Sequence, residues 1–260
     1  MAYKKTVIID AGHGGSDPGA VYMGRQEKED ALALALAVGE RLEEAGVNVI
    51  YTRTNDVYDT PLQKAQMANR SGADYFVSIH RNAMPVPGSA SGIEVLVYED
   101  YGVPAALARN ISRELEETGL KDLGVKERPG LIVLRRTQMP AVLVEAGFID
   151  NERDNQFFDE NLERMAQAVA DGVLDTIKEE EEKRPEYYQV QVGAFRERGP
   201  AERLLGELQA RGLPAFMVYE DGYYKVRVGA FLNMDNGANM ERILRGMGYA
   251  TMLVKEKAVY

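Results

Sequence analysis

The chain has only two histidines, and both stand in the same kind of place. His13 follows a short apolar run in a glycine-rich turn, and His80 ends a second apolar run. A third apolar run ends in the carboxylate of Glu145. Short apolar runs are typical of buried strands, and the loops after strands carry much of the chemistry of α/β proteins. The three runs therefore predict one site built from two imidazoles and a carboxylate.

The two imidazoles, together with one carboxylate other than Glu145, would form the ligand set of a catalytic metal ion with an open position for water. The absence of cysteine excludes thiolate zinc sites and thiol nucleophiles. Glu27 is the leading third ligand, because the chain returns there past the His13 loop. Asp17 and Asp10 are alternatives, and Asp10 could instead orient an imidazole. Bound Zn²⁺ polarises a carbonyl and lowers the pKa of its water to about 7, so with Glu145 moving protons we predict amide hydrolysis.

The segments that must position these side chains alternate between strand and helix patterns. Strand patterns cover residues 7–9, 47–53, 74–80, 93–98, 131–134 and 141–144. Helix patterns cover residues 27–45, 61–70, 104–118 and 151–182. This alternation predicts an α/β fold, with a twisted, mostly parallel sheet that carries helices on both faces.

Composition excludes several classes of protein. The net charge of −10 over 260 residues is not that of a nucleic-acid-binding protein, which would show a basic face. No apolar run approaches the roughly 18 residues of a membrane-spanning helix. The first residues lead into a strand pattern and not into a signal peptide. We expect synthesis in the cytoplasm without a signal peptide, followed by release or non-classical export.

Charge divides the chain into two parts. From Arg184 onward there are 11 basic and 9 acidic residues, a net charge of +2, which leaves −12 for residues 1–183. The acidic run 179–182 favours a solvated helix end that leads into a linker. We therefore predict a first domain over residues 1–178, a charged linker over 179–186 and a second domain over 187–260.

The second domain contains an internal repeat. Val190-Gln-Val-Gly-Ala-Phe195 recurs as Val226-Arg-Val-Gly-Ala-Phe231, and each copy is followed by a helix pattern and then a strand pattern. The order βαββαβ predicts a small α+β domain of the ferredoxin or RNP-like kind, with an antiparallel sheet and two helices on one face.

Four sequence blocks carry a family resemblance. In chain order they are Ile9-Asp-Ala-Gly-His13-Gly-Gly-x-Asp-Pro-Gly19, Glu27-Lys28, Ser78-Ile-His80-x-Asn-Ala83 and Val144-Glu145-x-Gly-Phe148-x-x-Asn151. Together they resemble the signature blocks of the zinc N-acetylmuramoyl-L-alanine amidases, the amidase-3 family.

The resemblance implies a role for each of these residues. It implies one Zn²⁺ per catalytic domain held by His13, Glu27 and His80, with Glu145 as general base and acid. It implies cleavage of the amide between N-acetylmuramic acid and the L-alanine of the peptidoglycan stem peptide. Asn82, with the backbone of Gly14 and Gly15, is the expected substrate-binding helper.

The repeat resembles the sporulation-related repeat domain, SPOR, whose members bind peptidoglycan glycan strands that have lost their stem peptides. Strand alternation supports such a role, because the repeat valines would face the helices and leave polar side chains on the open face. That face would combine an aromatic ring with hydrogen-bonding and cationic groups. The expected glycan-binding residues are Gln189, Gln191, Tyr223, Lys225 and Arg227.

The combined expectation is a peptidoglycan hydrolase tethered to the cell wall, similar to the mother-cell autolysins of sporulation. Its partners would be stem peptides at the first domain and denuded glycan strands at the second, with no nucleic acid and no transmembrane segment. Three alternatives stay open: a phage endolysin of the same chemistry, a zinc peptidase that cuts within the stem peptide, and a non-catalytic wall-binding protein.

Overall fold

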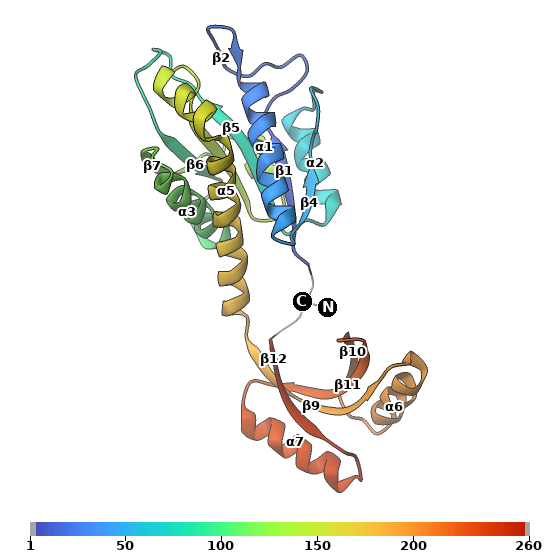
Figure 1. The fold of residues 1–260 in the computed structure, drawn as a ribbon. Coiled ribbons are helices and arrows are strands. Elements are labelled where there is room, and N and C mark those ends of the chain that lie inside the picture. The colour runs from blue at the N-terminus through green and yellow to red at the C-terminus, as the bar shows by residue number, and fades with distance from the viewer. Residues whose placement is uncertain (1–3, 258–260) are drawn as a thin grey trace. The chain divides into compact units, whose positions relative to one another are not determined.

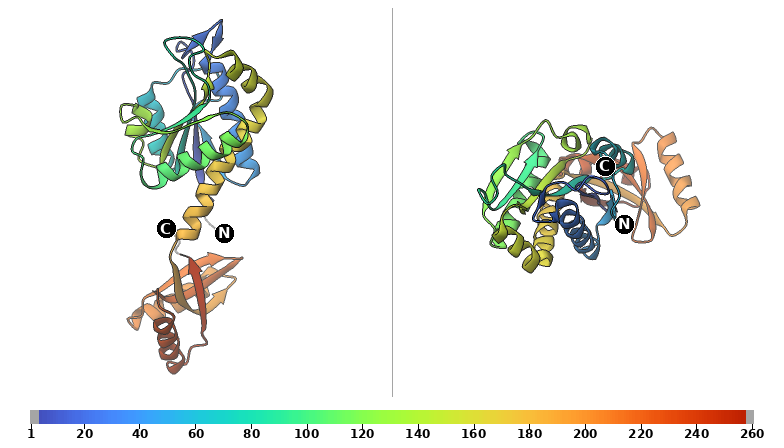
Figure 2. Two further views of the ribbon diagram at one scale, coloured as in Figure 1. Left: turned by 90° about the vertical axis from the view of Figure 1, so that its left-hand side faces the viewer. Right: turned by 90° about the horizontal axis from the view of Figure 1, so that it is seen from above.

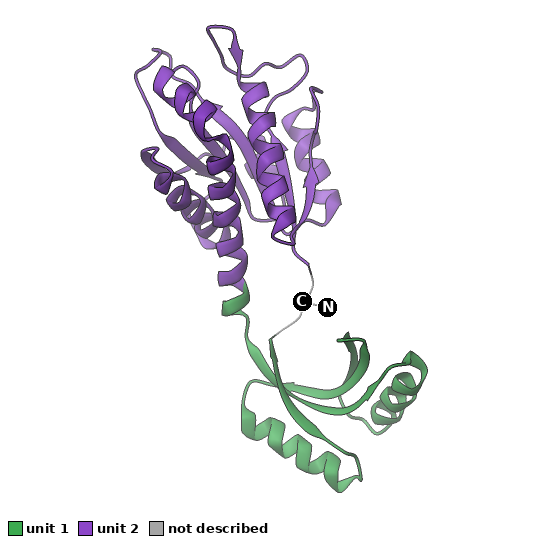
Figure 3. Ribbon diagram, in the orientation of Figure 1, with its two compact units in different colours: residues 1–3, 181–260 green, residues 4–180 purple. Residues whose placement is uncertain are grey.

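The computed structural model describes residues 4–257, which form two compact units (Figures 1 and 3). The first unit is Lys4–Glu180, and the second begins at Glu181. Helix α5 (Glu152–Lys183) runs past this division, and strand β9 begins at Glu186. The expected linker over 179–186 is therefore mostly regular structure, because glutamate and lysine are good helix formers and extend α5 to its charged end. No helix in the described part of the chain is long and apolar enough to cross a membrane.

The first unit is built on a six-stranded sheet of order β4-β1-β5-β8-β6-β7. Neighbouring strands run parallel except at the antiparallel pair β6–β8, which confirms the mostly parallel sheet. The strands are β1 (Thr6–Ala11), β4 (Asn48–Tyr51), β5 (Tyr75–Asn82), β6 (Ile93–Val97), β7 (Asp122–Glu127) and β8 (Ala141–Phe148). A separate two-stranded hairpin consists of β2 (Val21–Tyr22) and β3 (Arg25–Gln26).

Helices cover both faces of this sheet, as the alternation of patterns predicts (Figure 2). One face packs against α1 (Glu27–Glu44), α3 (Gly102–Glu117) and α5, and the other packs against α2 (Pro61–Ser71) and α4 (Ile132–Arg136). Successive side chains of a strand point to opposite faces. In β1, Val7 and Ile9 accordingly join the first core, and Ile8 joins the second.

Apart from the short hairpin β2–β3, which was not predicted, two elements of the first unit differ from the sequence prediction. Residues 131–134 were predicted as a strand, but the structure forms α4 there. A short apolar run is ambiguous between strand and helix, and here Val133 and Leu134 fill the core beside α2. The strand pattern missed β7, because this strand lies at the sheet edge and contains Gly124 and charged residues with little burial.

The second unit has the predicted order βαββαβ and an antiparallel sheet of order β10-β11-β9-β12. Its elements are β9 (Glu186–Phe195), α6 (Arg198–Ala210), β10 (Ala215–Glu220), β11 (Tyr223–Phe231), α7 (Met234–Gly246) and β12 (Met252–Lys257). The repeat valines Val190, Val226 and Val228 are fully buried and pack with Leu208 of α6 and Leu244 of α7. The predicted α+β fold of this unit is therefore confirmed.

Candidate metal centre

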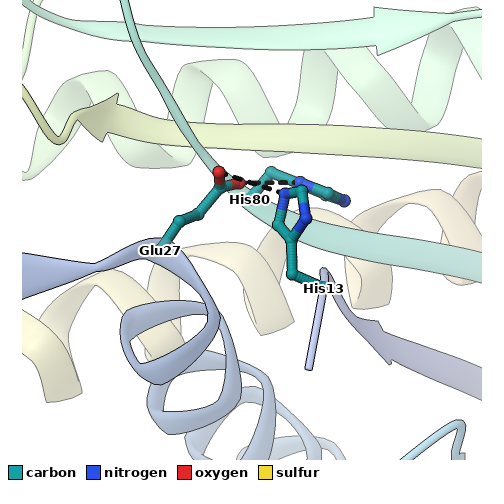
Figure 4. Close-up of side chains that lie close together, drawn as sticks. All are labelled: His13, Glu27 and His80. Carbon is teal, nitrogen blue, oxygen red and sulfur yellow. Dashed lines mark hydrogen bonds and ion pairs between the residues drawn. The ribbon is translucent and has the colours of Figure 1, made fainter. Parts of the chain in front are cut away.

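Three side chains meet at the carboxyl end of the central strands. His13 follows β1, His80 lies near the end of the adjacent parallel strand β5, and Glu27 is the first residue of α1. One ligand atom from each lies within 4.8 Å of the others, and within the described residues this is the group suited to hold a metal ion. Figure 4 shows the carboxylate of Glu27 facing both imidazoles. Its Oε1 lies 2.8 Å from Nδ1 of His80, and its Oε2 lies 3.1 Å from Nε2 of His13.

The buried carboxylate of Glu27 is held by backbone amides as well as by the imidazoles. Ala20 donates its N–H to Oε2 at 2.9 Å, and Arg81 donates its N–H to Oε1 at 3.1 Å. Burial by itself would raise the pKa of Glu27, but hydrogen bonds and charge from His13 and His80 outweigh it and hold that pKa far below its usual range. Glu27 is therefore already an anion in the metal-free protein.

The negative charge of Glu27 changes the pKa of His13. Burial would lower its pKa, but the hydrogen bond to Glu27 and the charge of Glu27, with a further hydrogen bond that the ring donates to Asp17, raise the pKa of His13 to about 9. The Oδ2 atom of Asp17 lies 2.9 Å from Nδ1 of His13 and orients the ring. In the metal-free centre, the proton on His13 therefore supplies the positive charge that balances the carboxylate of Glu27. Two imidazoles and a carboxylate are a donor set that suits Zn²⁺, which would displace that proton on binding.

Glycines make room for the side chains of His13, Glu27 and His80. A Cβ atom on Gly12 would lie 2.4 Å from the imidazole of His80. A Cβ atom on Gly19 would lie 2.6 Å from both Glu27 and His13, and the backbone φ of Gly19 is +67°. Contacts this short cannot form without displacing one of these three side chains, so the glycines of the first sequence block allow the loop to approach the site closely.

Glu145 stands on the strand next to His80. The two residues are partners in the parallel register of β5 and β8, and Glu94 of β6 is the partner of Glu145 on the other side. The Oε2 atom of Glu145 is buried and has no hydrogen-bond partner among the described residues. Burial is the main cause that raises the pKa of Glu145 to about 7; the charge of His80 opposes this rise, and the charges of Glu27 and Glu94 add to it. Such a group can exchange a proton near neutral pH.

The rival carboxylates have other partners. Asp10 accepts hydrogen bonds from Ser78 and Thr52 and pairs with Lys64 Nζ at 2.9 Å, in a buried network behind the site. Asp17 contacts His13 through the nitrogen turned away from Glu27. The structure therefore places Glu27 between the two imidazoles, Asp17 as the orienting partner of His13, and Asp10 in the network behind the site.

The expected substrate-binding helpers are engaged within the protein. Asn82 donates from its amide nitrogen to Glu94 Oε2 at 3.1 Å and accepts from the N–H of Ala83. The N–H of Gly14 is bonded to the carbonyl of Asp17, and that of Gly15 to Asp56. Glu94 was missed from the sequence, although a charge inside an apolar strand was an available signal.

A cleft of about 350 Å³ opens beside the imidazoles. Its wall is mostly apolar and includes Pro61, Leu131 and Ile132. A larger cavity of about 580 Å³ lies between residues 89–91 and 119–123, but it reaches neither histidine nor Glu27. The smaller cleft is therefore where a substrate would meet the two imidazoles.

The five expected glycan-binding residues share the sheet face of the second unit opposite the buried valines. These side chains differ in how far they are exposed and in the contacts that they make within the protein. Arg227 is buried, and its guanidinium donates to Gln189, Glu220 and Glu256. The guanidinium of Arg196 lies 5.7 Å from the ring centre of Tyr223. Arg227 is therefore the centre of a polar network that organises this face.

Comparisons with known proteins match each of the two units to a known family. Residues 7–175 match the family model for N-acetylmuramoyl-L-alanine amidase, and residues 185–255 match the SPOR domain. The amidase CwlM of Bacillus licheniformis is 37% identical over 221 residues, which cover 83% of this chain and 85% of CwlM. The sporulation-specific N-acetylmuramoyl-L-alanine amidase of Bacillus subtilis is 34% identical with the same coverage. The crystal structure of N-acetylmuramoyl-L-alanine amidase from Clostridium difficile 630 matches with a TM-score of 0.64 at 32% identity, and covers 67% of this chain and 97% of that one.

Proposed function

This chain belongs to the N-acetylmuramoyl-L-alanine amidase family, and from that premise we propose that it hydrolyses peptidoglycan with a zinc ion held by His13, Glu27 and His80. The bond cut is the amide between N-acetylmuramic acid and the L-alanine of the stem peptide. The observation that carries the zinc proposal is the gathering of the three ligands within 4.8 Å, beside a carboxyl group whose pKa is about 7.

Each residue has a task in this reaction. Asp17 holds Nδ1 of His13, which leaves Nε2 directed at the ligand position beside Glu27. Zinc bound there would act as a Lewis acid that polarises the amide carbonyl and acidifies the attacking water. Glu145 takes the proton of that water and delivers it to the departing amine of L-alanine, a transfer that suits a carboxyl group with a pKa near neutrality. The apolar wall of the cleft beside the imidazoles would shield part of a bound substrate from water.

Mass spectrometry of digested walls tests the proposal. Purified peptidoglycan incubated with the zinc-loaded protein should release intact stem peptides that begin with L-alanine, while the glycan strands stay uncut. Fragments that begin inside the stem would indicate a peptidase, and the absence of any release would indicate a wall-binding protein. Either result would contradict the proposed reaction.

We further propose that the second unit retains the enzyme on glycan during lysis of the mother-cell wall in sporulation. The two Bacillus amidases align with this chain over 221 residues, more than the first unit contains, so the likeness extends into the second unit. The endolysin of Bacillus phage SPP1 is 35% identical over 183 residues. The additional SPOR match over 185–255 favours the sporulation role over a phage endolysin.

Removal of residues 184–260 should leave cleavage of soluble muropeptides unchanged and reduce sedimentation with purified walls severalfold. The first unit has its own core, so it should remain folded. Sedimentation is best measured with Glu145→Gln in both chain lengths, so that the walls are not digested. Equal sedimentation of the two lengths would refute the tethering role.

Point variants refine this test. Tyr223→Ala in the full chain should weaken sedimentation, because Tyr223 supplies an aromatic ring on the proposed glycan face. Tyr219→Ala is the matched control, since Tyr219 is half-exposed on the opposite face of the same sheet, where it is the register partner of Tyr224. Equal losses in both variants would place the binding surface elsewhere.

A further inference from the structure

A buried arginine joins the segments that carry two of the proposed zinc ligands. Arg53 follows β4, and its side chain is enclosed by the His13 loop and the start of α1. Its Nη2 donates to the carbonyl of Gly12 at 2.7 Å and to the carbonyl of Lys28 at 2.8 Å. Gly12 is adjacent to His13, and Lys28 is adjacent to Glu27. One guanidinium nitrogen thus bridges the neighbours of both ligands.

The remaining donors of this guanidinium extend the bridge. Nε donates to the carbonyl of Ala11 at 3.1 Å, and Nη1 donates to the carbonyl of Asn55 at 3.1 Å. Among the residues that the structure describes, every acceptor of a hydrogen bond from Arg53 is therefore a backbone carbonyl. A buried cation is costly unless its donors are satisfied, and the planar fork of arginine reaches several carbonyls at once in a way that lysine cannot. This arrangement links three chain segments through one rigid group.

The bridged loop is strained. His13 has a φ of +57°, in the left-handed region that residues other than glycine rarely occupy, and Gly14 and Gly15 that follow also have positive φ. Lys64 adds a second buried cation, which donates to the carbonyl of Ala11 at 2.5 Å. A strained loop persists only when its surroundings hold it in place.

We propose that Arg53 is a positioning residue that fixes the spacing between His13 and Glu27 before a metal ion arrives. The proposal rests on the zinc site of the proposed function. Without the bridge, the His13 loop would spend part of its time in relaxed conformations that separate the two ligands. The apparent affinity for an ion is the intrinsic affinity multiplied by the fraction of molecules that have the competent arrangement, so it falls as that fraction falls. Arg53 would therefore act on metal affinity without touching the metal.

Arg53→Lys tests this role, because it keeps the charge but cannot bridge the same carbonyls. In the metal-free full chain, amide hydrogen exchange over residues 12–20 should become at least about tenfold faster. Competition with a chelator should show zinc affinity about tenfold or more below that of the wild type. Ile111→Ala is the control, since Ile111 is a buried residue of α3 packed against Gly172 of α5. It should lower the melting temperature and leave both zinc affinity and exchange over 12–20 unchanged.

The outcomes separate the two proposals. A wild-type protein that binds zinc as tightly as Arg53→Lys, with equal exchange over 12–20, would overturn the positioning role and leave the zinc proposal standing. Equal losses in Arg53→Lys and Ile111→Ala would also overturn it, because general destabilisation would then explain the effect. A wild-type protein that bound no zinc would refute the zinc site, and exchange in the metal-free protein would still decide whether Arg53 holds the loop.

Discussion

Glu145→Gln should reduce wall lysis by about 10²–10⁴-fold and also make the metal-free protein more stable at alkaline pH. The loss of activity follows from the proposed role, because an amide can neither accept the proton of the attacking water nor return it to the leaving amine. Glutamine has nearly the shape of a protonated glutamate, so substrate binding and the zinc ligands should be preserved. Activity and stability should therefore change in opposite directions.

The stability gain follows from the raised pKa of Glu145. Burial is the main cause that moves this pKa from 4.5 to about 7, so the folded protein favours the neutral carboxyl group. Stability associated with this group is fully present below pH 4.5 and is lost as the pH rises through 7. The difference between the two pKa values corresponds to about 3 kcal/mol at high pH. Glutamine stays neutral throughout and avoids this loss.

Urea unfolding of both metal-free proteins at pH 4.5 and pH 8.5 measures the effect. The free energies of unfolding should be similar at pH 4.5, and Glu145→Gln should be the more stable protein at pH 8.5. Glu99→Gln, at an exposed loop position, should change neither activity nor this pH dependence. A glutamine variant that lyses walls at the wild-type rate would remove Glu145 from the reaction, whatever its stability.

Glu27→Gln should bring wall lysis to background by weakening zinc binding at least about 100-fold. The substitution replaces the one anionic ligand by a neutral amide. It should also change the titration of His13 in the metal-free protein, because Glu27 is the main group that raises the pKa of this imidazole to about 9. Without that carboxylate, the pKa of His13 should return toward its ordinary value near 6.5.

Nuclear magnetic resonance of histidine-labelled protein can follow this titration, since the chain contains two histidines. In the metal-free wild type, the raised pKa stabilises the fold below pH 6.5, and this contribution is lost as the pH rises through about 9. In Glu27→Gln, the stability of the fold should not decrease in this way as the pH rises. Glu29→Gln, an exposed residue in the same turn of α1, is the control and should titrate as the wild type does. If the pKa of His13 stayed near 9 in Glu27→Gln, the charge balance described for this centre would be wrong.

Much of the architecture could be predicted from local pattern. Apolar runs separated by helix patterns predict a mostly parallel sheet with helices on both faces, because strands buried on both sides must be apolar throughout. The repeat predicts the second unit in the same way. Since parallel strands end at one edge, placing His13, His80 and Glu145 at the ends of predicted strands was enough to predict that they lie near one another, although β5 and β8 continue past His80 and Glu145.

Tertiary contacts decided what local pattern could not. The choice of Glu27 over Asp10 and Asp17 depends on where α1 begins relative to the His13 loop and on amides donated by distant residues. The places of α4 and β7 depend on which core receives them and on which strand lies at the sheet edge.

The sequence by itself determined the fold class, the two units and the apolar strands that carry or precede the titratable residues, because all of these follow from the order of residues along one segment. Only the tertiary structure revealed that Arg53 bridges the neighbours of His13 and Glu27, that Glu94 is the register partner of Glu145, and that Arg227 is buried in a polar network. Each of these depends on atoms that are far apart in the chain and meet only when it folds.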